Sequence, residues 1–110
     1  MKILVTGGCG YKGSVLIPKL LKEEFNVINI DTQWFGNYLY TDKNLVVEKK
    51  DIRELDSNDF SDMDIVIHLA NIANDPAVEL RQELSWEVNV LTTLKISEFS
   101  KKNKVKKFIY

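Results

Sequence analysis

Five short apolar runs are spaced along this chain, and two longer stretches between them carry apolar residues at helical spacing. The short runs are rich in isoleucine, valine and leucine, which favour buried strands, and they occupy residues 3–5, 26–31, 45–48, 64–70 and 107–110. The longer stretches predict helices over residues 11–23 and 84–103. A shorter helix is predicted over residues 54–60, and loops are predicted over residues 32–43 and 71–76.

The apolar positions of the two long helices predict which helical faces are buried. In the first helix these positions are Val15, Leu16, Leu20 and Leu21. In the second helix the candidates for burial are Trp86, Val90, Leu94 and Ile96. Each helix is therefore expected to pack one face against the strands.

The order of these elements predicts an α/β fold. Strands with nearly continuous apolar sequences are typical of parallel sheets that helices cover on both faces. If the strands are numbered along the chain, right-handed crossovers give the spatial order 3-2-1-4-5. The chain ends within the fifth predicted strand, so we expect a sheet that is truncated there.

Composition narrows the classes of function. The 110 residues suffice for one domain, and 45% hydrophobic with 28% charged residues is typical of a soluble globular chain. A formal net charge of −1 indicates no preference for nucleic acid or a membrane surface. With one cysteine and one histidine, the sequence predicts neither a disulfide framework nor a metal site.

No apolar run reaches the roughly 18 residues that cross a bilayer. The N-terminal apolar run is too short for a signal peptide, so a cytoplasmic protein is expected.

Spaced glycines follow the first predicted strand directly and lead into the first predicted helix. The segment T-G-G-C-G-Y-K-G at residues 6–13 contains both G-x-G-x-x-G and G-x-x-G-x-x-G. In such a loop Gly7 allows a sharp turn off the strand, Gly10 leaves room for a pyrophosphate beside the backbone, and Gly13 lets the helix lie close to the sheet. The amides of the helix N-terminus then face the phosphates. The segment therefore predicts a Rossmann-like dinucleotide site, and a plain strand-to-helix turn is the alternative.

Asp31 ends the second predicted strand, about 20 residues after the glycines. Its carboxylate is expected to accept hydrogen bonds from the ribose hydroxyls of a cofactor and to repel a 2′-phosphate. Residues 32–34 include no arginine that would bind such a phosphate. The sequence therefore predicts NAD rather than NADP as the cofactor, and the alternative is that Asp31 is an ordinary turn residue.

With these motifs the chain resembles the extended short-chain dehydrogenase/reductase family, and within it the NAD-dependent sugar-nucleotide epimerases and dehydratases. Two residues depart from the family pattern, because Asn71 stands where a second alanine is usual and Thr92 where a glycine is usual. The resemblance extends over essentially the whole chain. The segments that carry it are T-G-G-C-G-Y-K-G at 6–13, Asp31, D-I-R at 51–53, H-L-A at 68–70, W-E-V-N-V at 86–90 and K-K-F-I-Y at 106–110.

The resemblance implies a role for several residues. Asp51 and Ile52 would lie against the adenine, with Asp51 accepting a hydrogen bond from the adenine amino group. Residues 69–71 would pass beside the pyrophosphate and the nicotinamide ribose, and Asn89 would stabilise the neighbouring backbone. The full set of expected cofactor-binding residues is Gly7, Gly10, Tyr11, Lys12, Gly13, Asp31, Thr32, Asp51, Ile52, Leu69, Ala70, Asn71 and Asn89.

Catalytic residues are not assigned in this chain. The family uses a tyrosine followed four residues later by a lysine, and none of the four tyrosines here has that lysine. His68 and Cys9 are expected to be structural, although a thiol at a helix N-terminus with a lowered pKa is an alternative for Cys9. We therefore expect residues 1–110 to be an incomplete NAD-binding domain that lacks the C-terminal substrate lobe and is inactive alone.

Three hypotheses about function remain. The resemblance implies the NAD-binding N-terminal portion of a sugar-nucleotide epimerase or dehydratase, which oxidises a sugar carbon by transient hydride transfer to NAD. A stand-alone NAD-binding regulatory or scaffold domain without catalysis is the second hypothesis, and a reductase that uses NADP is the third. The resemblance also implies a homodimer through the helix predicted over residues 84–103, and a nucleotide-sugar substrate in the full-length parent.

Overall fold

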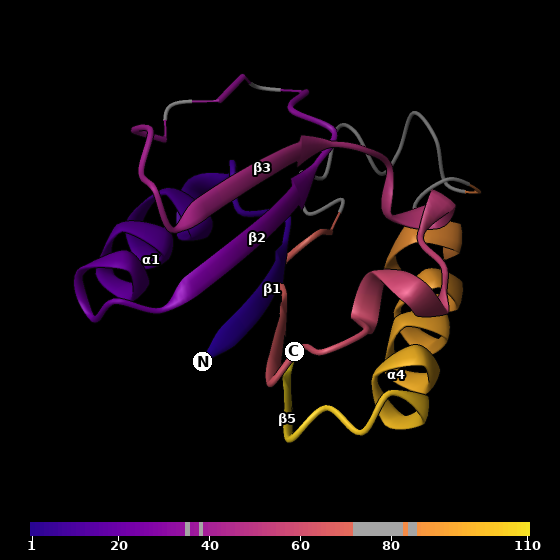
Figure 1. Ribbon diagram of the computed structural model, residues 1–110. Coiled ribbons are helices and arrows are strands. Elements are labelled where there is room, and N and C mark those ends of the chain that lie inside the picture. The colour runs from indigo at the N-terminus through magenta and orange to yellow at the C-terminus, as the bar shows by residue number, and fades with distance from the viewer. Residues whose placement is uncertain (35, 38, 72–82, 84–85) are drawn as a thin grey trace.

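Five parallel strands form one sheet in the computed structural model, which describes residues 1–34, 36, 37, 39–71, 83 and 86–110. Helix α1 covers one face of the sheet, while α4 and two short 3₁₀ helices cover the other (Figure 1). The elements in chain order are β1 (Lys2–Thr6), α1 (Tyr11–Lys22), β2 (Asn26–Asp31), β3 (Leu45–Lys49), the 3₁₀ helices η1 (Ile52–Glu54) and η2 (Ser57–Phe60), β4 (Ile65–His68), the π-helical turn η3 (Glu87–Leu91), α4 (Thr92–Lys102) and β5 (Lys107–Ile109).

The strand order is β3-β2-β1-β4-β5, which confirms the predicted parallel sheet. Strand β1 is central, because it pairs with β2 on one side and with β4 on the other. The chain therefore proceeds from β1 toward one edge of the sheet and later returns to build the other edge. The reversal lies between β1 and β4, and in open α/β sheets ligands bind beside the carboxyl ends of the strands at such a point.

Side chains alternate between the two faces along each strand and divide the core into two layers. Ile3 and Val5 of β1 pack on the α1 face together with Ile17 of that helix. Leu4 faces the other way and packs with Phe60 of η2 and Ile96 of α4. Because both faces of the sheet are covered by apolar residues, the central strand β1 and its neighbour β4 have nearly continuous apolar sequences.

The buried face of α1 differs from the predicted one. Val15 is exposed, whereas Ile17, which the prediction omitted, is completely buried. Leu16, Leu20 and Leu21 are partly buried against the same core layer, as predicted. Residues 15–17 are all apolar, so the periodicity of the sequence does not decide which of them faces the sheet.

In the second long helix, Glu83 and Trp86 are already helical; the π-helical turn η3 follows Trp86, and α4 follows η3 directly. Ile96 is buried as predicted, and Val90 is partly buried. The predicted burial of Trp86 and Leu94 is wrong, because these side chains are 59% and 60% exposed. A π turn contains one extra residue, which rotates the helical face by about 100° and breaks the regular spacing on which the prediction relied. Residues 84 and 85 lie outside the described part of the chain.

The single short helix predicted over residues 54–60 is two separate 3₁₀ turns. Asp51 caps η1 through the amide of Arg53, and Asp56 starts η2 with a reciprocal capping box to Asp59. The predicted loop over residues 71–76 lies outside the described residues, apart from Asn71. In the described part of the chain, no helix has the length and apolarity to cross a membrane.

Candidate functional site

The carboxyl ends of β1, β2 and β4 border one cavity of about 340 Å³, at the point where the strand order reverses. Backbone hydrogen bonds hold these ends together. The Gly7 amide donates to the Ile30 carbonyl of β2, and the Leu69 amide donates to the Thr6 carbonyl of β1. The volume is within the range of sites for small molecules and cofactors. The lining residues are Gly7, Cys9, Gly10, Tyr11, Lys12, Ile30, Asp31, Thr32, Trp34, Gly36, Lys50, Asp51, Ile52, Arg53, Leu69, Ala70, Asn71 and Val88.

The loop of residues 7–13 turns sharply off β1, as predicted. Gly7 has φ +75°, a left-handed conformation that favours glycine. Its α-carbon also lies against the backbone of Ala70, so that a β-carbon there would overlap the amide of Ala70. Gly7 therefore determines both the turn and the close contact between the loop and the segment after β4.

Gly10 and Gly13 have different surroundings. A β-carbon on Gly10 would approach only the Gly7 carbonyl oxygen, at 3.4 Å, so this position faces open space beside the cavity. A β-carbon on Gly13 would overlap the backbone of Gly8. Gly13 thus lets the first turn of α1 lie directly against the glycine loop, two residues after the end of β1, and its effect on the distance between helix and sheet stays a prediction.

Helix α1 begins at the cavity. Gly10 is its N-cap, and no side chain caps the helix there. The first amides of a helix have no partner within the helix and give its N-terminus a partial positive charge. Tyr11 and Lys12 of this first turn line the cavity, and Lys12 adds a full positive charge. This end of the cavity is suited to an anion such as a phosphate.

Asp31 lies at the end of β2 and lines the same cavity. One carboxylate oxygen accepts from the amide of Cys9 at 2.9 Å, and the other accepts from the amide of Gln33 at 2.6 Å. Each carboxylate oxygen can accept two hydrogen bonds and accepts one of these, so that an acceptor position on each remains for a hydroxyl group of a ligand. Asp31 thus joins the glycine loop to the end of β2 in addition to facing the cavity.

Asn29 is a residue of this site that the sequence analysis missed. It is completely buried, its side-chain oxygen accepts from the Gly8 amide at 2.8 Å, and its amide donates to the Cys9 sulfur at 3.3 Å. A polar residue within an otherwise apolar strand was the signal that could have identified it.

Burial raises the pKa of the Cys9 thiol, and the nearby negative charge of Asp31 raises it further. The hydrogen bond from Asn29 lowers the pKa by a smaller amount. The alternative of a thiol with a lowered pKa is therefore wrong.

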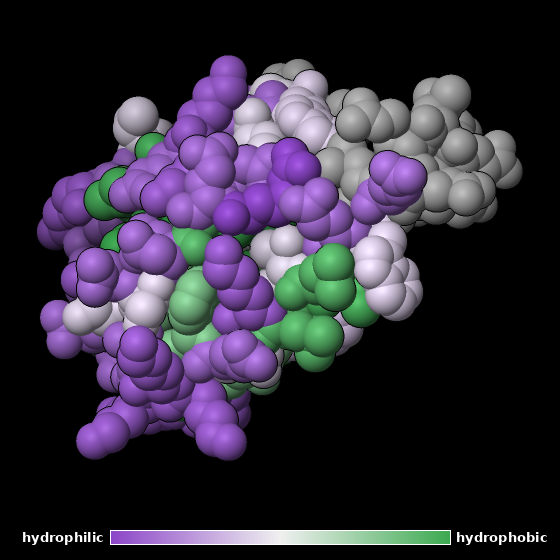
Figure 2. Space-filling view, turned by 90° about the vertical axis from the view of Figure 1, so that its right-hand side faces the viewer, coloured by the Kyte–Doolittle hydropathy of each residue, from purple (hydrophilic) through white to green (hydrophobic). Residues whose placement is uncertain are grey.

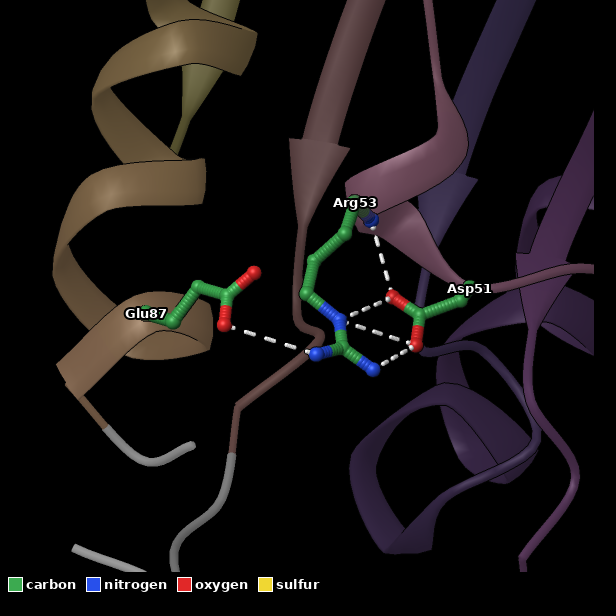
Figure 3. Close-up of polar contacts among 3 residues, drawn as sticks. All are labelled: Asp51, Arg53 and Glu87. Carbon is green, nitrogen blue, oxygen red and sulfur yellow. Dashed lines mark hydrogen bonds and ion pairs between the residues drawn. The ribbon is translucent and has the colours of Figure 1, made fainter. Parts of the chain in front are cut away.

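Asp51 lines the cavity as expected, but its carboxylate is already bound to Arg53 (Figure 3). The Arg53 side chain donates from Nε to both carboxylate oxygens at 3.0 Å and from an η nitrogen at 2.6 Å. These hydrogen bonds, opposed by burial and assisted by the Arg53 backbone amide, hold the pKa of Asp51 below its usual value. The same contacts raise the pKa of Arg53, so that both groups stay charged.

The remaining expected residues divide into two groups. Ile52, Thr32 and residues 69–71 line the cavity. Gly13 and Asn89 do not line it. Asn89 lies in η3, where its carbonyl accepts from the Thr93 hydroxyl at 3.1 Å.

His68 is buried beside the cavity and does not line it. Its Nδ1 is 2.6 Å from the Thr6 hydroxyl, and its Nε2 is 2.9 Å from the Thr93 hydroxyl. The Thr93 hydroxyl donates to the Asn89 carbonyl, so it accepts from Nε2, and Nδ1 accepts from Thr6. Burial lowers the pKa of His68 to about 4, so the ring is neutral at neutral pH. Neutral His68 thus connects β1 and β4 to helix α4.

A family profile and a curated relative both associate this chain with epimerases. Residues 3–110 match the profile of a family described as the NAD dependent epimerase/dehydratase family. A curated protein of Methanocaldococcus jannaschii, described as "Putative UDP-glucose 4-epimerase", is 32% identical over 98% of this chain.

Solved structures superpose on the whole described fold. A UDP-N-acetylglucosamine 4-epimerase of Methanobrevibacter ruminantium, in complex with UDP-N-acetylmuramic acid, has a TM-score of 0.90 with 29% identity over 99% of this chain. A UDP-glucose 4-epimerase of Thermus thermophilus, in complex with NAD, has a TM-score of 0.84 with 27% identity over 100% of this chain. The chain spans 36% of the length of the curated relative and 36% and 37% of these two structures.

Proposed function

This chain belongs to the NAD dependent epimerase/dehydratase family, and we propose that its cavity binds NAD. The observation that supports this most directly is the placement of the first turn of α1 and the carboxylate of Asp31 on the walls of one cavity. A dinucleotide needs a site for its diphosphate and a site for the adjoining ribose, and these two features supply both.

The residues present fit the cofactor. The open space beside Gly10 lets a phosphate approach the backbone, and Lys12 adds positive charge at the same end. Asp31 supplies a carboxylate for ribose hydroxyls, and Ala70, with its small side chain, lines the other side. We propose that the other expected cofactor-binding residues that line the cavity also contact NAD. Gly13 and Asn89 do not line it, and we propose that they stabilise the backbone around it.

We propose further that residues 1–110 are the N-terminal portion of a longer epimerase or dehydratase. The relatives that support this are about three times as long, and one of them is a complex with NAD. Bound NAD would accept a hydride from a sugar carbon of a nucleotide sugar and later return it. This chain would contribute the binding and orientation of the cofactor. A tyrosine followed four residues later by a lysine, in the sequence after Tyr110 of the longer protein, is the feature that tests this proposal.

A stand-alone NAD-binding domain without catalysis remains the second candidate. Its distinguishing feature would be a 110-residue chain that is stable and binds NAD with no further segment. The apolar side chains on β5 and after it favour the first candidate, because Ile109 is 43% exposed and Tyr110 is 75% exposed. In parallel α/β sheets such side chains are normally covered.

The experiment that tests cofactor binding is a calorimetric titration of the purified chain with NAD. We expect saturable binding of one equivalent per chain. The variant Lys12→Gln should weaken binding several-fold, because it removes a cation next to the helix N-terminus. The matched variant Lys22→Gln, at the far end of the same helix, should bind as the wild type does. No saturable binding to the wild-type chain would contradict the proposed function.

We also propose a homodimer through the helical segment predicted over residues 84–103. Apolar residues gather on the face that carries α4 (Figure 2), and the exposed ones on this segment are Trp86, Leu91 and Leu94. Exposed apolar patches of this kind are typical of protein–protein interfaces. Sedimentation of the wild type and of Leu94→Glu tests the proposal, since a dimer should dissociate in the variant and a wild-type monomer at high concentration would contradict it.

A further inference from the structure

A continuous chain of hydrogen bonds connects helix α4 to the wall of the cavity. The Thr93 hydroxyl lies 3.1 Å from the carbonyl oxygen of Asn89 and 2.9 Å from Nε2 of His68. On the other side of the ring, Nδ1 of His68 lies 2.6 Å from the Thr6 hydroxyl, whose oxygen lies 3.4 Å from the amide of Ala70. Thr6 and His68 are buried, and of these five residues only Ala70 lines the cavity.

The direction of each hydrogen bond in this chain follows from the number of protons. The Thr93 hydroxyl donates its one proton to Asn89, so Nε2 of His68 donates to Thr93. The ring is neutral, because burial lowers its pKa to about 4, and it has no second N–H. The bare Nδ1 therefore accepts the proton of Thr6, and the Thr6 oxygen is left to accept from the amide of Ala70.

Thr6 holds the segment after β4 at two successive amides. Its carbonyl accepts from the Leu69 amide at 2.9 Å, and its hydroxyl oxygen accepts from the Ala70 amide. The second contact is long, so it depends on a lone pair of the hydroxyl that points at the amide. A hydroxyl that rotates freely would meet this condition only part of the time. His68 prevents the rotation, because it accepts the hydroxyl proton.

The position of Ala70 determines how the cavity wall after β4 meets the glycine loop. The backbone of Ala70 lies directly against Gly7, and both residues line the cavity. Leu69 and Asn71, on either side of Ala70, line the cavity as well. A displacement of Ala70 therefore changes the width of the cavity at the glycine loop, and binding sites need their walls held to a fraction of an ångström.

We propose that His68 is a positioning residue of the cofactor cavity, because it fixes the Thr6 hydroxyl that holds Ala70 in the cavity wall. The inference rests on the proposed function, since it concerns the affinity of this cavity for NAD. His68 itself does not line the cavity and acts through Thr6. Thr93 acts through His68, because it determines which ring nitrogen carries the proton.

The first measurement uses the wild-type chain. Nitrogen NMR of the imidazole distinguishes a proton on Nε2 from a proton on Nδ1, and the assignment is direct because the chain has one histidine. We expect the proton on Nε2, both with and without NAD. A proton on Nδ1 overturns the inference without any variant, because the Thr6 hydroxyl would then have no acceptor on the ring.

Two amide variants separate the two sides of the ring. The side-chain oxygen of His68→Asn takes the place of Nδ1 and accepts from Thr6, whereas the longer amide of His68→Gln reaches the place of Nε2 and leaves Thr6 without its acceptor. Glutamine fills more of the space of the imidazole, so a purely structural role of His68 favours His68→Gln. Ser100→Ala is the matched control, because it removes a buried hydrogen bond of α4 at a residue that does not line the cavity.

Calorimetry of the folded variants, with circular dichroism as the check of folding, gives their affinities for NAD. His68→Asn is expected to bind NAD about fivefold more tightly than His68→Gln, the effect of one ordinary hydrogen bond. The amide of Ala70 should exchange its hydrogen faster in His68→Gln, and Ser100→Ala should bind NAD as the wild type does. Equal affinities of the two His68 variants, or tighter binding by His68→Gln, overturn the inference. Failure of the wild type to bind NAD instead contradicts the proposed function, and this inference with it.

Discussion

The amide of Cys9 donates to the carboxylate of Asp31 over 2.9 Å, so the glycine loop and the end of β2 are directly connected. The second carboxylate oxygen of Asp31 holds the amide of Gln33. Asp31 therefore has a structural function in addition to the proposed contact with a ribose. This combination explains how one side chain both shapes the cavity and faces it.

Replacing Asp31 by alanine should affect binding and stability together. Two amides lose their acceptor, so we expect the free energy of unfolding to fall by about 1–3 kcal/mol and the affinity for NAD to fall by about tenfold or more. Urea unfolding and calorimetric titration measure the two effects. Asp42→Ala is the control, because Asp42 also accepts from an amide two residues on, that of Asn44, but does not line the cavity. An unchanged NAD affinity in Asp31→Ala would contradict the account of this residue.

The two glycines at the start of α1 should respond differently to the same substitution. Gly10→Ala places a methyl group in open space beside the cavity, so stability should stay within about 0.5 kcal/mol while NAD affinity falls. Gly13→Ala forces a methyl group against the backbone of Gly8, and we expect a loss of about 1–3 kcal/mol in the free energy of unfolding. Urea unfolding curves measure the stability of both variants, and calorimetric titrations measure their affinity for NAD. Equal losses of stability in the two variants would contradict the described geometry.

Stability should depend on pH through His68. Its pKa is about 4 in the folded chain and about 6.5 in the unfolded chain, so the unfolded state binds more protons between these values. Stability should therefore be highest above pH 6.5 and fall as the pH decreases toward 4, by about 3 kcal/mol for this group.

The chain has one histidine, so the difference between wild type and His68→Gln isolates this contribution. The carboxylates of Asp51 and Asp64 have lowered pKa values and lose their stabilising effect only at lower pH. Urea unfolding between pH 4 and 7 measures the slope. A variant with the same slope as the wild type would show that His68 is not responsible.

NADP should bind more weakly than NAD, by about tenfold or more. The carboxylate of Asp31 would repel a 2′-phosphate at the proposed ribose site. Lys50 and Arg53 line the same cavity, but each already pairs with a carboxylate. Titration with both cofactors measures the ratio, and equal or tighter binding of NADP would contradict the assignment.

The sheet could be predicted from the sequence because strand topology depends on patterns that the sequence shows directly. Apolar runs, the spaced glycines and the rule for right-handed crossovers together determine the order of the five strands. The turn at Gly7 could be predicted for the same reason, since few residues other than glycine adopt its backbone conformation.

The details that the sequence analysis missed depend on side-chain partners and helical phase. The π turn at Glu87–Leu91 changes which residues of the following helix are buried, and no local pattern indicates it. The pairing of Asp51 with Arg53 was missed because the choice among partners depends on side-chain conformation. Asn29 was missed because its function depends on the amide of Gly8, 21 residues away in the chain.

The most direct test of the central claim is a titration of the isotopically labelled chain with NAD, followed by NMR of the backbone amides. We expect the largest, saturable shifts at Gly10, Tyr11 and Lys12, with further shifts at Asp31 and Ala70, because these residues line the cavity. The amides of β5 should change little, since none of its residues borders that cavity. Absence of shifts in the glycine loop, or larger shifts at β5 than at the start of α1, would contradict the assignment of this cavity to a dinucleotide.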